Sequence, residues 1–360
     1  MFYFLKKTWS TMQPFAYCLR LIDITNYLNE KNMNMRGFIG MITLFSFLLT
    51  TTTACSQINH VKANGTYKTK NIKIGSFDKI NLQGSPTVIY TQSTDNKSTL
   101  EIYGSDNILN LVECTVSDGT LFVSFKKGTN IEFGKEGRLK IMASSPMLKD
   151  VLLQGSGDVV LNNKVKSDRL SLTLKGSGDI NAGEIVCTNA FSATLQGSGD
   201  ISVKNSINAG NVDLNLSGSG DLDIYNLTAK STTAILRGSG DLKVKGTNVA
   251  GDVTVNLSGS GDLDFVGIQG ETVKAELQGS GDLKVAGTAQ RAVLSLRNSG
   301  DLNAKDLKAV DVDASVNGSG SISCYVSGTL KCNISGSGDI GYKGSPVNIQ
   351  SNGKRNPHKL

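Results

Sequence analysis

Apolar and polar residues alternate in short runs along most of this chain, and the runs recur at fixed distances from a Gly-Ser-Gly-Asp motif. Seven and five residues before the motif aspartate, and one and three residues after it, the chain carries an apolar residue. In the copy that ends at Asp262, these residues are Val255, Leu257, Leu263 and Phe265. Because successive side chains of a strand point to opposite faces, this period of two predicts strands.

The motif occurs ten times, with its copies 18 to 21 residues apart. Self-similarity at a fixed period near twenty residues is typical of a solenoid in which one repeat forms one coil. The eighth copy reads Asn-Ser-Gly-Asp and the ninth reads Gly-Ser-Gly-Ser. The motif aspartates are Asp158, Asp179, Asp200, Asp221, Asp241, Asp262, Asp282, Asp301 and Asp339, and Ser321 takes the aspartate position in the ninth copy.

Each repeat supplies a strand, a Gly-Ser-Gly corner, a second short strand and a looser segment with one more apolar residue. The sequence therefore predicts an all-β fold, a single-stranded parallel β-helix of about 20-residue coils with three walls. Coils stacked at roughly 4.8 Å place like residues over like residues, so ten coils extend about 48 Å. Asn298 replaces the first corner glycine once, which predicts a left-handed backbone at that position. The extra apolar residues include Ile185, Ile207, Leu227, Ile268 and Leu307.

The stretch before the first repeat is a less regular β segment of the same helix. Gly84, Ser85 and Pro86 stand where Gly-Ser-Gly would be, and four further β-runs follow. Asp118-Gly119 lies between two of these runs, which predicts a hairpin or tight turn. We divide the chain into residues 1–32, a non-native or wrongly assigned extension; 33–55, a signal peptide; 56–76, a polar spacer; 77–150, the irregular β segment; 151–343, the tandem β-helix; and 344–360, a cap and basic tail.

The region from Met33 to Cys55 has the order of a secretory signal. Arg36 precedes an apolar run, residues 38–49, and small residues follow it. The run is short for a transmembrane helix, which needs about 20 residues. A cysteine after Thr-Thr-Ala resembles a bacterial lipobox, although Thr52 replaces the usual leucine. We expect Cys55 to be lipidated and to hold the protein at a membrane; secretion with cleavage nearby is the alternative.

The leader, the Phe77-Asp78-Lys79-Ile80 start and the Gly-Ser-Gly-Asp copies together resemble the putative auto-transporter adhesin, head GIN domain family. The resemblance extends from about Phe77 to Ile349. It implies a single-chain β-helix of the bacterial cell envelope, in an outer-membrane lipoprotein or at the cell surface, with no established ligand and no catalytic residues. The number of copies exceeds that expected of one such domain, which leaves a duplicated or extended rod as an alternative.

The stacked motif aspartates are the main candidate for site chemistry. Neighbouring carboxylates about 4.8 Å apart repel by roughly 0.9 kcal/mol even in water, so some group must relieve them. Hydrogen bonds from corner N–H groups are one relief and calcium is the other. The known calcium repeat with Gly and Asp has a nine-residue period, unlike this one. We therefore predict a structural turn and no cofactor, with calcium as the alternative.

Charge and composition narrow the function further. The chain has 37 basic and 31 acidic residues, too balanced for a nucleic-acid interface. Its histidines, His60 and His358, lie in terminal segments, and its one tryptophan, Trp9, lies in the leader, so neither histidine-based catalysis nor an aromatic sugar platform is favoured.

These features favour a non-enzymatic structural or binding surface for an unknown protein or glycan ligand, with homo-oligomerisation open. The alternative is a carbohydrate-active β-helix enzyme or a glycan-binding module. Four cysteines outside the leader act either as small core residues or as disulfide partners. They are Cys114, Cys187, Cys324 and Cys332.

Overall fold

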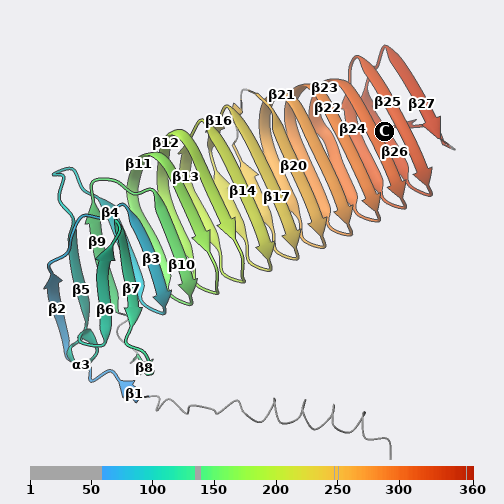
Figure 1. The fold of residues 1–360 in the computed structure, drawn as a ribbon. Helices are drawn as coiled ribbons and strands as arrows, with labels where there is room; N and C mark the ends of the chain where they lie inside the picture. The colour runs from blue at the N-terminus through green and yellow to red at the C-terminus, as the bar shows by residue number, and fades with distance from the viewer. Residues whose placement is uncertain (1–58, 134–138, 247, 250, 354) are drawn as a thin grey trace, which may run out of the picture. The chain divides into compact units, whose positions relative to one another are not determined.

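The computed structural model describes residues 59–133, 139–246, 248–249, 251–353 and 355–360. These residues form a parallel β-solenoid in which each coil lies on the preceding one (Figure 1). The predicted all-β solenoid is confirmed, and the helix among the described residues is the single turn α3 (Asp106–Leu109). The predicted extension, the signal peptide and Cys55 lie outside the described residues.

Each coil has three extended runs, which form three walls. The long strands β11 (Asp158–Leu174) and β12 (Ile180–Leu195) pair in parallel over three stretches, with register shifts after Leu161 and after Ser167. We call the run that leads to the Gly-Ser-Gly corner the first wall, the run that begins at the motif aspartate the second wall, and the remaining run the third wall. The other strands of the repeats are β10 (Asp150–Gly155), β13 (Ile201–Asn208), β14 (Asn211–Gly218), β15 (Leu222–Tyr225), β16 (Leu227–Ala229), β17 (Ser231–Gly238), β18 (Leu242–Lys245), β19 (Asn248–Val249), β20 (Val253–Gly259), β21 (Leu263–Gly279), β22 (Asp282–Asn298), β23 (Asp301–Gly318), β24 (Ser321–Val326), β25 (Thr329–Gly336) and β26 (Asp339–Gly344).

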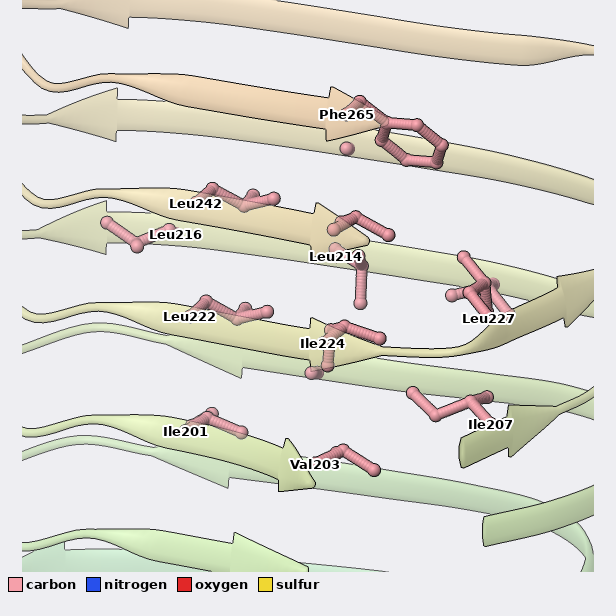
Figure 2. Packing of buried hydrophobic residues seen from close by; sticks show 14 of the residues in the cluster. Ile201, Val203, Ile207, Leu214, Leu216, Leu222, Ile224, Leu227, Leu242 and Phe265 are labelled. Carbon is pink, nitrogen blue, oxygen red and sulfur yellow. The ribbon is translucent and has the colours of Figure 1, made fainter. Parts of the chain in front are cut away.

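The core is a set of apolar columns that run along the stack. Leu257 lies in register with Leu236 on the preceding coil and with Leu277 on the next. Figure 2 shows the same arrangement in the second wall, where Ile201, Leu222 and Leu242 follow one another. The four predicted inward columns and the five predicted third-wall residues are buried; in the last repeat, Tyr342 is only partly buried. A single coil could not exclude water from these side chains, so stacking itself creates the core.

The Gly-Ser-Gly corner needs glycine for two reasons. Gly259, the first corner glycine of its copy, has a φ of +150°, a positive value that residues with a side chain rarely adopt. Asn298, which replaces this glycine in the eighth copy, has the predicted positive φ, of 81°. A Cβ at Gly261 would lie 2.0 Å from the carbonyl oxygen of Gly240 on the preceding coil. Successive backbones therefore touch at the corner, and any side chain there would force the coils apart.

The irregular β segment begins the solenoid in register with the repeats. Gly84 pairs with Gly155 and Val88 with Val159, so this segment supplies a coil below the first motif. Farther from the repeats the pairing becomes antiparallel, and β6 and β7 form the predicted hairpin around Asp118. The strands of this region are β3 (Lys79–Gly84), β4 (Thr87–Gln92), β5 (Thr99–Ser105), β6 (Val112–Ser117), β7 (Thr120–Phe125), β8 (Thr129–Glu132) and β9 (Lys140–Ser145).

The stretch predicted as a polar spacer contains two strands. β1 (Asn59–Lys62) pairs with β8 in parallel, and β2 (Tyr67–Ile72) pairs with β5 in the antiparallel direction. Tyr67 stacks on Tyr103 with ring centroids 5.7 Å apart, and Ile72 packs against the core. An aromatic pair and one apolar anchor thus fix a stretch whose composition is otherwise polar.

The C-terminal residues continue the stack for part of another coil. β27 (Asn348–Gly353) pairs with β25, and β28 (His358–Lys359) pairs with β26, both in parallel. In this coil Ser351 follows Cys332, and Gly353 follows Ile334. Polar or small residues therefore replace two of the inward apolar columns where the core ends, while Ile349, which follows Leu330, stays apolar but is exposed.

Candidate binding surface

The motif aspartates form a hydrogen-bonded ladder along the corner between the first and second walls. From Asp158 to Asp282, the Oδ1 atom of each aspartate accepts the backbone N–H of the next one, at distances of 2.8 to 3.3 Å. At the ninth copy, Asp301 Oδ1 accepts both the backbone N–H of Ser321, at 3.2 Å, and its hydroxyl, at 2.6 Å. Each of these bonds ties one coil to the next.

A second column beside the ladder alternates in charge. Asp223, Lys243, Asp264 and Lys284 follow one another in register on the second wall. Lys243 Nζ lies 2.9 Å from Asp241 Oδ2. Burial opposes the ionisation of Asp241, but hydrogen bonds from Lys243 and from the Asp262 N–H outweigh it and hold the pKa of Asp241 below its ordinary value. Lys243 therefore relieves part of the repulsion between the carboxylates.

The same surface offers little metal-binding geometry. Among the residues that the structure describes, no group of three or more His, Cys, Asp or Glu side chains is arranged to hold a metal ion. Histidines lie at opposite ends of the described chain: His60 is on β1, and His358 Nδ1 lies 3.1 Å from Asp339 Oδ2 on the last coils. The carboxylate ladder has N–H partners, and its structural role, with calcium binding as the alternative, stays a prediction to be tested.

The outer face of the first wall has a different character. Its outward positions, four and six residues before the motif aspartate, carry mostly hydroxyl and amide side chains, with apolar exceptions at Leu152 and Ile235. Such side chains both donate and accept hydrogen bonds without a net charge. The hydroxyl and amide residues are Gln154, Thr173, Thr194, Gln196, Asn215, Ser217, Asn256, Ser258, Gln278, Ser295, Ser315, Asn317, Asn333 and Ser335.

One part of this face is hollowed. A depression of about 240 Å³ crosses the first-wall parts of β17, β20, β21 and β22, which lie on consecutive coils (Figure 1). We call it the first-wall depression. The side chains of Arg237 and Arg297 mark its two ends, and Asn256, Glu276 and Gln278 lie between them. Its outward lining is completed by Ile235, Ser258 and Ser295.

Some polar groups of the first-wall depression have a partner within the protein and others have none. Glu276 Oε1 lies 2.8 Å from Lys274 Nζ. Neither Arg237 nor Arg297 has a hydrogen-bond or ion-pair partner within the described part of the chain. The Asn256 Oδ1 atom is buried and also lacks a hydrogen-bond partner there. Two free guanidinium groups are therefore available to a ligand, and the Asn256 oxygen becomes an acceptor for it once the side chain turns outward.

The sequence does not predict the depression. The outward residues of the depression differ from copy to copy, so they give no periodic signal. The motif aspartates do recur, and they indicate the corner instead. One signal is present: Arg237 and Arg297 stand at the same offset, four residues before Asp241 and Asp301. Equal offsets in a solenoid place residues in one column.

The four cysteines of the described region are free thiols, and three of them are buried. Burial raises the pKa of Cys324 to about 12, and the nearby Cys332 adds to the shift. Such thiols remain protonated near neutral pH and act as small apolar core residues. Across the residues with described structure, no helix has the length and apolar character of a membrane span.

A family model and several solved structures match the chain. The profile of the family described as "Putative auto-transporter adhesin, head GIN domain" matches residues 76–267 and residues 236–346. A putative adhesin from Bacteroides fragilis NCTC 9343, of solved structure, is 25% identical, with 83% of this chain and 98% of that chain covered and a TM-score of 0.30.

Two further solved structures match over a similar length. A putative adhesin from Parabacteroides merdae ATCC 43184 is 23% identical, with 84% of this chain and 99% of that chain covered and a TM-score of 0.38. A protein from Parabacteroides distasonis ATCC 8503, described as a putative lipid binding protein, is 23% identical, with coverages of 84% and 100% and a TM-score of 0.34. No curated protein matches the chain.

Proposed function

Because this chain belongs to the putative auto-transporter adhesin, head GIN domain family, we propose that it is a non-enzymatic binding protein of the cell envelope. In this proposal the solenoid is a rigid scaffold, a lipid on Cys55 holds it at a membrane, and the outer face of the first wall binds an extended ligand. The family and the adhesins among its structural relatives support a location at the cell surface or in the envelope.

The observation that carries the proposal is the outer face of the first wall. It presents hydrogen-bonding side chains on coil after coil, with the same backbone spacing throughout. Loops usually carry binding residues, but here regular strands hold them, so the face needs no rearrangement to meet a long ligand. A preformed array of weak contacts suits a polymer or a broad protein surface, because many contacts add along its length.

A carbohydrate-active enzyme is less well supported by the same face. Glycoside hydrolysis in most enzymes needs two carboxyl groups on either side of one bond. The first-wall depression has one carboxylate, Glu276, and Lys274 is paired with it. Burial raises the pKa of Asp150 and of Asp223, but these residues lie on the first and second walls respectively and do not form a facing pair.

The anchor is tested by replacing Cys55 with serine. We expect the wild-type protein in the membrane fraction of expressing cells and Cys55→Ser in the soluble or secreted fraction, because the lipid would be its only attachment. Metabolic labelling with a fatty-acid analogue should mark the wild type alone. Retention of Cys55→Ser in membranes, or an unlabelled wild type, would refute the anchor.

The binding role is tested separately with the mature chain on arrays of glycans and of extracellular proteins. The proposal predicts saturable binding without release of cleaved products. Turnover of any bound glycan, measured as new reducing ends, would instead support the enzyme.

A further inference from the structure

We propose that the first-wall depression binds an acidic polysaccharide that runs along the stacking axis of the coils, with its carboxylate or sulfate groups on Arg237 and Arg297. This inference rests on the proposed binding role and names its ligand class. Within the described residues, no comparable binding site is found at the aspartate ladder, the buried cysteines or the C-terminal edge, because none of them leaves an unpaired polar group in a cavity.

The charge of the depression calls for an anion. Four charged side chains lie in or beside it: Arg237, Arg297, Lys274 and Glu276. Three are positive and one is negative, which leaves an excess of two positive charges. Lys274 is paired with the glutamate, so the excess resides on the two arginines. A free guanidinium binds carboxylate, sulfate or phosphate groups through two parallel hydrogen bonds.

The spacing of the arginines calls for an extended ligand. They stand at the same offset in coils three steps apart, which separates their Cα atoms by about 14 Å along the axis. A single small anion cannot reach both. A polymer with acidic groups at intervals can, and it would lie parallel to the column of strands that both residues share.

The residues between the arginines call for hydroxyl groups. Asn256 Oδ1 is buried and unpaired, and its neighbours in register are Ile235 and Glu276, neither of which carries a donor. Because this oxygen is closed to solvent, a ligand hydroxyl reaches it only when the Asn256 side chain turns toward the depression; it then satisfies an acceptor whose unpaired burial costs free energy. Ser258, Gln278 and Ser295 offer further donors and acceptors nearby. Sugars supply such hydroxyls at every unit.

The composition of the lining favours a glycan over an acidic peptide or a membrane. The apolar lining consists of Ile235, which faces outward, and of three leucines buried in the core, Leu236, Leu257 and Leu277, so little apolar surface is available for peptide side chains or acyl chains. No aromatic side chain lines the depression, so a neutral sugar would lack a stacking partner. The affinity must therefore come from the charged contacts, which requires an acidic polymer.

The test uses the full mature chain and a hexamer of galacturonic acid, with the carboxyl-reduced hexamer as its neutral counterpart. Binding is measured by calorimetry at low and high salt. We expect saturable binding of the acidic hexamer that weakens with salt, and at least tenfold weaker binding of the neutral one. Equal binding of the two hexamers would overturn the proposal.

Variants locate the site. Arg237→Gln combined with Arg297→Gln should weaken binding of the acidic hexamer about tenfold or more, with an unchanged melting temperature, because both side chains are exposed. The matched control, Lys175→Gln with Lys230→Gln, removes the same charge outside the depression and should bind as the wild type does. Equal losses in the two double variants would reduce the effect to general electrostatics and refute the site.

Asn256→Ala should weaken binding about threefold, whereas Asn215→Ala, two coils away in the same column, should have no effect. A hexamer of glutamic acid provides the peptide comparison. If it binds as tightly as the acidic glycan and depends equally on the arginines, the ligand class is wrong. If the wild-type chain does not bind the acidic hexamer but is still anchored at the membrane and still binds other array ligands, this inference alone is refuted. The binding role then stays intact.

Discussion

The irregular β segment and the tandem repeats bury similar apolar columns but close them in different ways. In the repeats every coil is both supported and covered by a parallel copy of itself, and successive backbones touch at glycine corners. In the irregular segment the walls end in antiparallel strands, β5 on one side and β6 on another, with α3 beside them; β2, which precedes the segment, pairs with β5. The difference shows that repetition extends the rod, whereas a change of strand direction terminates it.

The C-terminal end is closed by a third means. There the strands stay parallel, but β27 and β28 replace most of the inward apolar residues with polar or small ones, Ile349 being the exception. An exposed parallel edge can pair with another chain, and polar, short strands reduce that risk. The two ends of the solenoid are therefore not equivalent, and the N-terminal end has the more elaborate cap.

The largest effect is expected at a corner glycine of the repeats. Gly261→Ala places a Cβ 2.0 Å from the carbonyl oxygen of Gly240, so the backbone must move and the stack must open. We expect a loss of more than about 4 kcal/mol in the free energy of unfolding. Gly75→Ala, just before the irregular segment, is the control, because its Cβ would meet only Val116 Cγ1, at 3.9 Å.

Urea denaturation followed by circular dichroism provides the measurement. The control should change the free energy by less than about 0.5 kcal/mol. A tolerated Gly261→Ala would show that the corner backbones are not in contact.

The next effect concerns the cap of the irregular segment. Leu109 of α3 is buried against the core, so Leu109→Ala should cost about 2 to 4 kcal/mol. The neighbouring Asn110 is exposed, and Asn110→Ala should be nearly neutral. Since the cap covers the first coils, we also expect Leu109→Ala to associate in light-scattering measurements. A fully stable, monomeric Leu109→Ala would mean that the repeats need no cap.

The walls and their register are predictable from the sequence because stacking imposes the same residue type at the same offset in every coil. Leu236, Leu257 and Leu277 align on their motif aspartates, and they do stack. The antiparallel closure is not predictable from the columns, because the period is lost there. A second corner of the coil is also not predictable, because its residue type changes from copy to copy. Asn226, with a φ of 52°, and Gly246, with a φ of 65°, occupy it at the same distance after their motif aspartates. The first-wall depression is not predictable from the sequence for the opposite reason, since stacking does not constrain which side chains point outward.

A smaller effect is expected at the aspartate ladder. Asp262 Oδ1 accepts the backbone N–H of Asp282 at 3.1 Å. Asp262→Ala removes this acceptor and should cost about 1 kcal/mol, whereas Asp262→Asn keeps an oxygen and relieves like-charge repulsion, so its loss should be smaller. Thr87 occupies the corresponding position in the irregular segment, and Thr87→Ala should change stability little. Equal losses for Asp262→Asn and Asp262→Ala would indicate that the charge itself is required.

A thermal melt of the mature chain with and without millimolar calcium separates a scaffold role of the Gly-Ser-Gly-Asp motif from a binding role. If the motif builds the scaffold and ligands bind on the first-wall face, calcium and chelator should leave the melting temperature unchanged. Glycan binding should also persist when Asp241, Asp262 and Asp282 are all replaced by Asn. A rise of several degrees with calcium that this triple variant abolishes would contradict the scaffold role, because the aspartate column would then be a metal site.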